Sequence, residues 1–161
     1  MLDAQDIVQR IAQCARERRL KVTTAESCTG GLIAKSLTDL PGSSEWFGYG
    51  FVTYSNAAKS DLLGVDPQAI EAHGAVSDST VRAMAEGALV CAGANYAIAV
   101  SGVAGPGGGS EHNPVGSVWI ACAGGGPTVT RHLQLEGDRA RVRERTALEA
   151  LQMLWERMDS E

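Results

Sequence analysis

The sequence predicts an α/β fold with three layers, in which helices cover both faces of a mixed, mostly parallel sheet. Segments with helical spacing of apolar residues alternate with β-rich segments along most of the chain. Tyr96–Val103 is a continuous apolar run, typical of a central strand buried on both faces. Two β-type segments near the C-terminal end are joined by a glycine-rich turn and predict an antiparallel hairpin. We expect residues 1–161 to form a single domain.

The first half of the chain predicts three helices and two strands. Apolar residues at helical spacing, with arginines toward the end, indicate a helix over 3–19. A β-type run follows at 20–25, and a short helix over 29–39 stops at Pro41-Gly42. The aromatic segment 46–54 predicts a strand, and Ser55-Asn56 caps a helix that ends at Gly64.

The second half predicts two more helices before the central strand, then the hairpin and a final helix. Pro67–His73 indicates a short helix, and Ser77 or Ser79 caps a longer one that runs to Ala92. The hairpin strands are expected at 115–123 and 128–135. Asp138 caps the last helix, over 139–157.

Composition narrows the class of protein and of partner. The net charge of −5 argues against nucleic acid as the main partner, and no segment approaches the length of a membrane span. The four cysteines lie far apart, which is typical of reduced thiols in a cytoplasmic protein rather than of a disulfide framework or a zinc site. The early acidic residues Asp3 and Asp6 do not fit a signal peptide. We therefore expect a cytoplasmic protein with no membrane partner and no metal.

Residues 22–31 carry the strongest chemical signal. A β-type run gives way at Ser27 to a helical segment that opens with Gly30-Gly31, so a serine lies beside the free amides of a helix start. Ser27 is the first candidate nucleophile, and its neighbour Cys28 is the alternative. A histidine base is not excluded, but none of the three histidines lies in a suggestive motif.

Lys59 is the alternative base, because burial and the start of a helix would both favour its neutral amine. The competing interpretation is an ordinary solvent-exposed helix lysine. The aromatic residues of the 46–54 segment could stack on a planar ring, although such residues more often form core or interface.

A glycine-rich loop, Gly105–Ser110, follows the predicted central strand. Glycines let backbone amides approach an anion, and ligands of open α/β sheets bind beyond the carboxyl ends of strands. The loop fits neither a P-loop nor the dinucleotide fingerprint, and a flexible surface turn is the alternative. The arginines of the final helix are either anion ligands or a solvated helix face.

Together these segments resemble the CinA C-terminal domain family over residues 5–155. The resemblance rests on Thr24–Gly31, on Gly50–Asn56 with Lys59, on His73–Ser77, on Ser101–Gly109 and on Pro114–Gly116. Active members of that family are nicotinamide-nucleotide amidases, so the resemblance implies hydrolysis of the carboxamide of nicotinamide mononucleotide in pyridine-nucleotide recycling, without a cofactor. It also implies a three-layer fold like that of the anticodon-binding-domain class. The resemblance, together with residues expected to be exposed such as Trp46, favours a homodimer. A non-catalytic nucleotide-binding module and an amidase for another small amide remain the alternatives.

Carried onto this sequence, the resemblance implies that Ser27 is the nucleophile, Lys59 the general base and Tyr54 a site residue that orients Lys59 or the substrate. Amides between Cys28 and Gly31 would bind the oxyanion. Thr24 and Glu26 are expected to orient the Ser27 turn. The substrate contacts expected from this chain are Thr24, Gly30, Gly31, Ser101, Gly105, Gly107 and Gly108, with Arg143 ahead of Arg139 for the phosphate.

Overall fold

A single five-stranded sheet organises the fold, and the computed structural model describes residues 2–161 around it. The strands are β1 (Val22–Glu26), β2 (Phe47–Val52), β3 (Tyr96–Gly102), β4 (Ser117–Ala123) and β5 (Val129–Gln134). The α-helices are α1 (Ala4–Arg18), α2 (Leu32–Thr38), α3 (Asn56–Leu63), α4 (Pro67–His73), α5 (Asp78–Ala92) and α6 (Arg139–Asp159). A short 3₁₀ helix, η1 (Ser43–Glu45), was not predicted. Among the described residues, no helix is both long and apolar enough to cross a membrane.

The sheet has the order β2-β1-β3-β4-β5 and is mixed, as predicted. β1 pairs in parallel with β2 and with β3, whereas β4 is antiparallel to both β3 and β5. Only β4 therefore runs against the other strands. The carboxyl ends of β2, β1 and β3 meet at one edge of the sheet, and the chain leaves these three strands side by side there.

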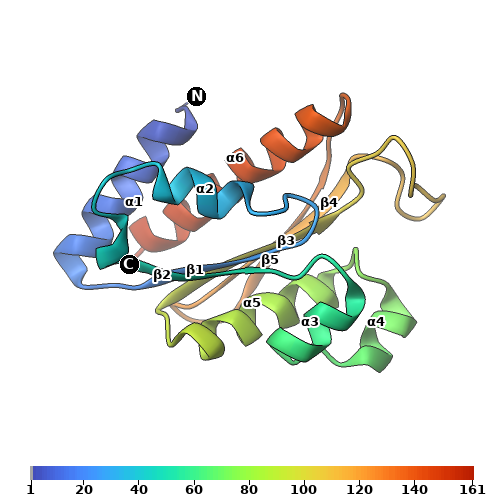
Figure 1. Cartoon of the computed structure of the whole chain (residues 1–161), viewed down its shortest axis with the longest axis horizontal. Helices are drawn as coiled ribbons and strands as arrows, with labels where there is room; N and C mark the ends of the chain where they lie inside the picture. Colours follow the sequence, from blue (N-terminus) through green and yellow to red (C-terminus); the bar gives the residue numbers. More distant parts are fainter. Residues whose placement is uncertain (1) are drawn as a thin grey trace.

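Helices cover both faces of the sheet, which confirms the three predicted layers (Figure 1). α1, α2 and α6 lie on one face, and α3, α4 and α5 lie on the other. The alternation of β3 divides the core accordingly: Ile98 and Val100 belong to the cluster with α1 and α6, and Ala97 and Ala99 belong to the cluster with α5. This alternation identifies the face toward which a strand residue points.

The helix that carries Lys59 is packed tightly against α5. A methyl group built on Gly87 of α5 would lie 2.0 Å from the carbonyl oxygen of Leu63, the last residue of α3. Glycine is needed there because any side chain would push the two helices apart. This contact fixes the C-terminal end of α3, and Ser55 fixes its start by accepting a hydrogen bond from the Ala58 amide at 3.0 Å.

The second strand ends earlier than the sequence predicted, at Val52 rather than at residue 54. The Thr53 amide still donates to the Glu26 carbonyl oxygen at 2.9 Å. Beyond that bond, the carbonyls of Thr53 and Tyr54 both accept from the side chain of Lys59. The chain leaves the sheet at this point because its carbonyls bind a side chain instead of a neighbouring strand.

Candidate active site

Ser27 lies in a tight turn between β1 and α2, at the carboxyl edge of the sheet. Its amide donates to the Val100 carbonyl of β3 at 3.1 Å, and its own carbonyl accepts from the Gly30 amide at 3.1 Å. Gly30 and Gly31 have φ values of 60° and 107°, which favour glycine. The turn therefore needs both glycines in order to reverse the chain directly behind Ser27.

The Glu26 side chain holds this turn from the opposite face of the sheet. Its buried carboxylate accepts from the Thr29 hydroxyl at 2.6 Å and from the amides of Ile33 and Ala34 at 2.9 and 3.0 Å. A carboxylate at a helix start satisfies amides that have no partner within the helix. Glu26 thus joins the end of β1 to the start of α2, in agreement with the expectation that it orients the turn.

Arg143 of α6 supports the same turn. Its Nε donates to the Cys28 carbonyl at 3.0 Å, and its Nη2 donates to the Thr29 carbonyl at 3.2 Å. The sequence placed Arg143 ahead of Arg139 as a phosphate ligand. In the structure its guanidinium donates hydrogen bonds to two backbone carbonyls, which makes Arg143 a support of the Ser27 turn, and its role as a phosphate ligand stays a prediction.

Lys59 brings its amine directly to Ser27 from α3. The Nζ lies 2.9 Å from the Ser27 Oγ, 2.9 Å from the Thr53 carbonyl oxygen and 3.2 Å from that of Tyr54. The exposed fraction is 1% for Lys59 and 8% for Ser27. The interpretation of Lys59 as a solvent-exposed helix lysine is therefore wrong, and the two residues predicted as nucleophile and base are in contact.

The surroundings of Lys59 favour its neutral form. Burial lowers the pKa of Lys59 from its ordinary value. Its place in the first turn of α3, at the positive end of the helix dipole, acts in the same direction. A neutral amine has two N–H donors and one lone pair. When Lys59 is neutral and its two donors bind the carbonyls of Thr53 and Tyr54, its lone pair faces the Ser27 hydroxyl.

Backbone amides of the turn are available beside this pair. The Gly30 amide is used internally, as described above, which removes it from the candidate oxyanion donors. Within residues 2–161, the amides of Cys28, Thr29 and Gly31 have no backbone acceptor. These three are the donors that remain next to Ser27 for a developing negative charge.

Arg139 crosses the mouth of the site. Its Nη2 donates to the Tyr54 hydroxyl at 3.1 Å, and its Nη1 donates to the Gly105 carbonyl at 2.9 Å. Tyr54 follows β2 and Gly105 follows β3, so this bridge spans the end of β1, where Ser27 lies. Tyr54 contacts Lys59 only through its backbone carbonyl, and its exposed ring lies at the entrance. Gly107 and Gly108 lie in the exposed part of the loop beyond Gly105.

Ser101 and Thr24, the two other side chains predicted to contact the substrate, lie in different surroundings. Ser101 ends up beside Ser27, because Glu26 is in register with Val100 and the next residues follow in line. Thr24 is fully buried within β1, with an exposed fraction of 0% and its hydroxyl beside Gly50 of β2. No substrate can reach Thr24, so its assignment as a substrate contact was wrong.

The alternative nucleophile and bases are placed unfavourably. The Cys28 thiol is buried, and burial raises its pKa to about 12, so the reactive thiolate is disfavoured. His132 contacts the hydroxyl of Ser117 instead of Ser27. His73 and His112 are exposed. Nowhere in residues 2–161 do three His, Cys, Asp or Glu side chains gather in a group that could hold a metal ion.

Comparisons with known proteins identify the family of this chain. Residues 4–158 match the profile of the CinA C-terminal domain. A putative competence-damage inducible protein of Symbiobacterium thermophilum is 53% identical over 94% of this chain, which spans only 38% of that relative. The nicotinamide-nucleotide amidohydrolase PncC of Escherichia coli is 49% identical over 96% of this chain and 94% of its own length. The crystal structure of the competence/damage inducible protein CihA from Agrobacterium tumefaciens superposes with a TM-score of 0.94 at 43% identity, covering 98% of this chain and 96% of that one. The chain belongs to the CinA C-terminal domain family.

Proposed function

We propose that the protein hydrolyses the carboxamide of nicotinamide mononucleotide to nicotinic acid mononucleotide and ammonia, in pyridine-nucleotide recycling, with Ser27 as nucleophile and Lys59 as general base. The observation that carries the proposal is the 2.9 Å contact between the Ser27 Oγ and a buried amine whose other neighbours are two carbonyls. A buried neutral lysine can activate a serine without a histidine. The Escherichia coli relative, a nicotinamide-nucleotide amidohydrolase, supports this substrate class.

In the first half of the reaction, the Ser27 Oγ attacks the carboxamide carbon while its proton passes to the Lys59 Nζ. The carbonyl oxygen becomes an oxyanion beside the turn amides of Cys28, Thr29 and Gly31. When the C–N bond breaks, the Lys59 ammonium returns the proton to the departing nitrogen, which leaves as ammonia. An ester between Ser27 and the nicotinoyl group remains.

In the second half, a water molecule attacks the same carbon and gives its proton to Lys59. The ester bond to the Ser27 Oγ then breaks, and Lys59 returns the proton to the serine. The carbonyls of Thr53 and Tyr54 keep the Lys59 lone pair directed at the reacting oxygen in both halves. The scheme needs one base that accepts and returns a proton twice, and it needs no cofactor.

The 5′-phosphate of the nucleotide is assigned to Arg139 and the loop that starts at Gly105. Arg139 is exposed at the entrance and makes hydrogen bonds to neutral partners, the Tyr54 hydroxyl and the Gly105 carbonyl. A phosphate is a stronger acceptor for a guanidinium than either of these groups. Arg143, which binds two carbonyls of the Ser27 turn, keeps a supporting role in this scheme.

Two further expectations concern the molecule's setting. We propose a cytoplasmic protein, supported by its four free cysteines. Trp46, which was expected to be exposed, is 1% exposed and cannot form a dimer contact. We propose instead a homodimer paired along β2, an edge strand without a charged side chain whose Tyr49 and Val52 are 57% and 48% exposed. Light scattering should give twice the chain mass of 16.9 kDa, and Tyr49→Lys should lower it to the monomer value. A monomeric native protein would contradict the pairing.

The reaction is tested by ammonia release from nicotinamide mononucleotide, with the acid product identified by mass spectrometry. Ser27→Ala should lose at least about 10³-fold in rate, because the attacking atom is absent. Cys28→Ala is the matched control in the neighbouring residue, and it should retain activity. Nucleotide binding by the wild-type protein without ammonia release would favour the binding module instead. Release from other amides alone would move the proposal to another substrate.

A further inference from the structure

A row of side chains crosses the sheet beside Ser27. Ser101 of β3 is paired with Trp119 of β4, and Trp119 is paired with His132 of β5. Ser27 continues the same row beyond β1, because Glu26 is in register with Val100. With neighbouring strands about 4.8 Å apart, the backbone of Trp119 lies about 10 Å from that of Ser27.

All four members of this row point to the face that carries α3 and α5. Ser27 meets Lys59 of α3. Ser101 follows the alternation of Ala97 and Ala99, which pack in the cluster with α5, and Trp119 packs against that same cluster. Ser27, Ser101 and Trp119 therefore form one continuous surface, in which the small Ser101 separates the nucleophile from the indole.

The Trp119 ring is supported on its far side. Its centroid lies 4.8 Å from that of His132, with the planes tilted by 31°. His132 is held in turn by the hydroxyl of the fully buried Ser117, at 2.8 Å from its Nε2. Because His132 occupies the β5 side of the indole, the other side of the ring is directed toward Ser101 and Ser27.

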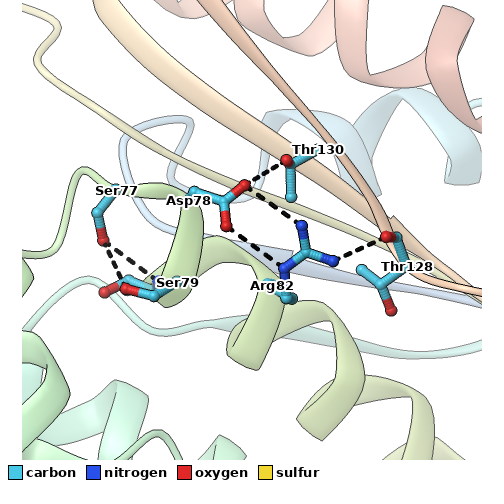
Figure 2. Close-up of polar contacts among 7 residues, drawn as sticks. Ser77, Asp78, Ser79, Arg82, Thr128 and Thr130 are labelled. Carbon is cyan, nitrogen blue, oxygen red and sulfur yellow. Dashed lines mark hydrogen bonds and ion pairs between the residues drawn. The ribbon is translucent and has the colours of Figure 1, made fainter.

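The start of α5 leaves this ring partly uncovered. Figure 2 shows Asp78, the first residue of α5, between Thr130 of β5 and Arg82, which also donates to the Thr128 carbonyl at 2.8 Å. Thr130 is paired with Ala121, two residues further along β4 than Trp119. The first residue of α5 therefore lies over Ala121 rather than over Trp119, and Trp119 is only partly buried.

The Ser101 hydroxyl points into the same space without a partner. Ser101 is 2% exposed, and its side chain makes no hydrogen bond to any other residue within 2–161. Among residues 2–161, the fully enclosed side-chain atoms without a partner belong to Thr24, Trp46 and Thr53, so the unpartnered Ser101 hydroxyl stays accessible to a polar group of a ligand. A ligand bound over Ser101 would lie between Ser27 and the indole.

We propose that Trp119 is a specificity-determining residue, whose indole stacks on the planar ring of the substrate while the carboxamide reaches Ser27. This inference rests on the proposed function and deepens it. The N-alkylated pyridine ring of a nicotinamide nucleotide is cationic and electron-poor, and tryptophan is the best side-chain partner for a cation over an aromatic face. The site thereby selects a cationic aromatic carboxamide over an aliphatic or neutral one.

The test uses binding as well as activity. In a Ser27→Ala background, which stops turnover, nicotinamide mononucleotide should quench tryptophan fluorescence by stacking on the indole. The chain has three tryptophans, so Trp119→Phe should remove most of the quenching, whereas the control Trp155→Phe on α6 should retain it. Quenching that survives Trp119→Phe would overturn the proposal.

Affinity gives a second readout. Trp119→Leu should raise the Kd for nicotinamide mononucleotide on the order of tenfold, and Trp119→Phe should raise it by about threefold or less. In the enzyme with Ser27, the loss should appear mainly in KM. An active wild-type enzyme with an unchanged KM in Trp119→Leu would refute this inference alone. Quenching without ammonia release from the wild-type protein would refute the proposed function and leave the stacking intact.

Discussion

The Glu26 carboxylate offers the sharpest test of how the Ser27 turn is held. Its two oxygens accept three hydrogen bonds, of which the Ala34 amide takes Oε2 alone at 3.0 Å. Glu26→Gln replaces one acceptor oxygen by an NH₂ group. If the new side-chain amide keeps its oxygen toward Thr29 and Ile33, its NH₂ group faces the backbone N–H of Ala34, and two donors meet without an acceptor. Losing one buried bond to a charged acceptor costs about 2 kcal/mol in the free energy of unfolding.

For a chain of this length, that loss corresponds to a fall in Tm of about 4–8 °C. Calorimetry and urea unfolding measure it directly. The matched control is Glu45→Gln. The Glu45 side chain is 65% exposed, and this variant removes its charge from an ion pair with Arg16. That variant should change the free energy of unfolding by about 0.5 kcal/mol or less. Equal stability of the two variants would refute the role given to Glu26.

Three further predictions follow from the packing and charge of the site. Gly87→Ala should destabilise the protein by about 1–3 kcal/mol and reduce turnover, because the added methyl group would meet the Leu63 carbonyl and displace α3. The control in urea unfolding is Gly48→Ala, whose methyl group would meet nothing within 4 Å. The kcat/KM should rise with pH through the pKa of Lys59, which burial holds below its ordinary value of 10.5. Between the lowered pKa of Lys59 in the folded protein and its ordinary value, the unfolded chain binds more protons than the folded one, so the free energy of unfolding of the wild-type protein should rise with pH. Lys59→Met should abolish this rise. A difference in the free energy of unfolding between wild type and variant that does not change with pH would contradict the assignment. In the native protein, iodoacetamide should modify the exposed Cys91 and spare the buried Cys28 and Cys122, because burial raises the pKa of both buried thiols to about 12. Alkylated Cys28 in the mass spectrum of the folded protein would count against its burial.

The architecture was predictable because its signals are local. The apolar run at Tyr96–Val103 and the caps at Ser55, Ser77 and Asp138 mark elements by their own sequence, and each of those caps is confirmed. The strand order was not predictable in this way, since it depends on which elements pack together. The neighbouring positions of β2 and β1 bring Lys59 to Ser27 across 32 residues of sequence.

The features of the site that the sequence missed have a common cause, because each depends on how distant elements pack. Thr24 belongs to the same sequence motif as Ser27, but the strand places its side chain inside the sheet. Arg143 resembles any surface arginine in sequence, and only the fold brings its guanidinium to the carbonyls of Cys28 and Thr29. Trp119 was missed because its relation to Ser27 is a matter of strand register, for which the sequence has no local signal.

The most direct test of the central claim is a double-mutant cycle on ammonia release, with Ser27→Ala, Lys59→Met and the double variant. If Ser27 and Lys59 act as one unit, each single variant should lose at least about 10³-fold in kcat, and the double variant should lose little more than either. A double variant whose loss equals the product of the two single losses would contradict the account, because the serine and the lysine would then act independently.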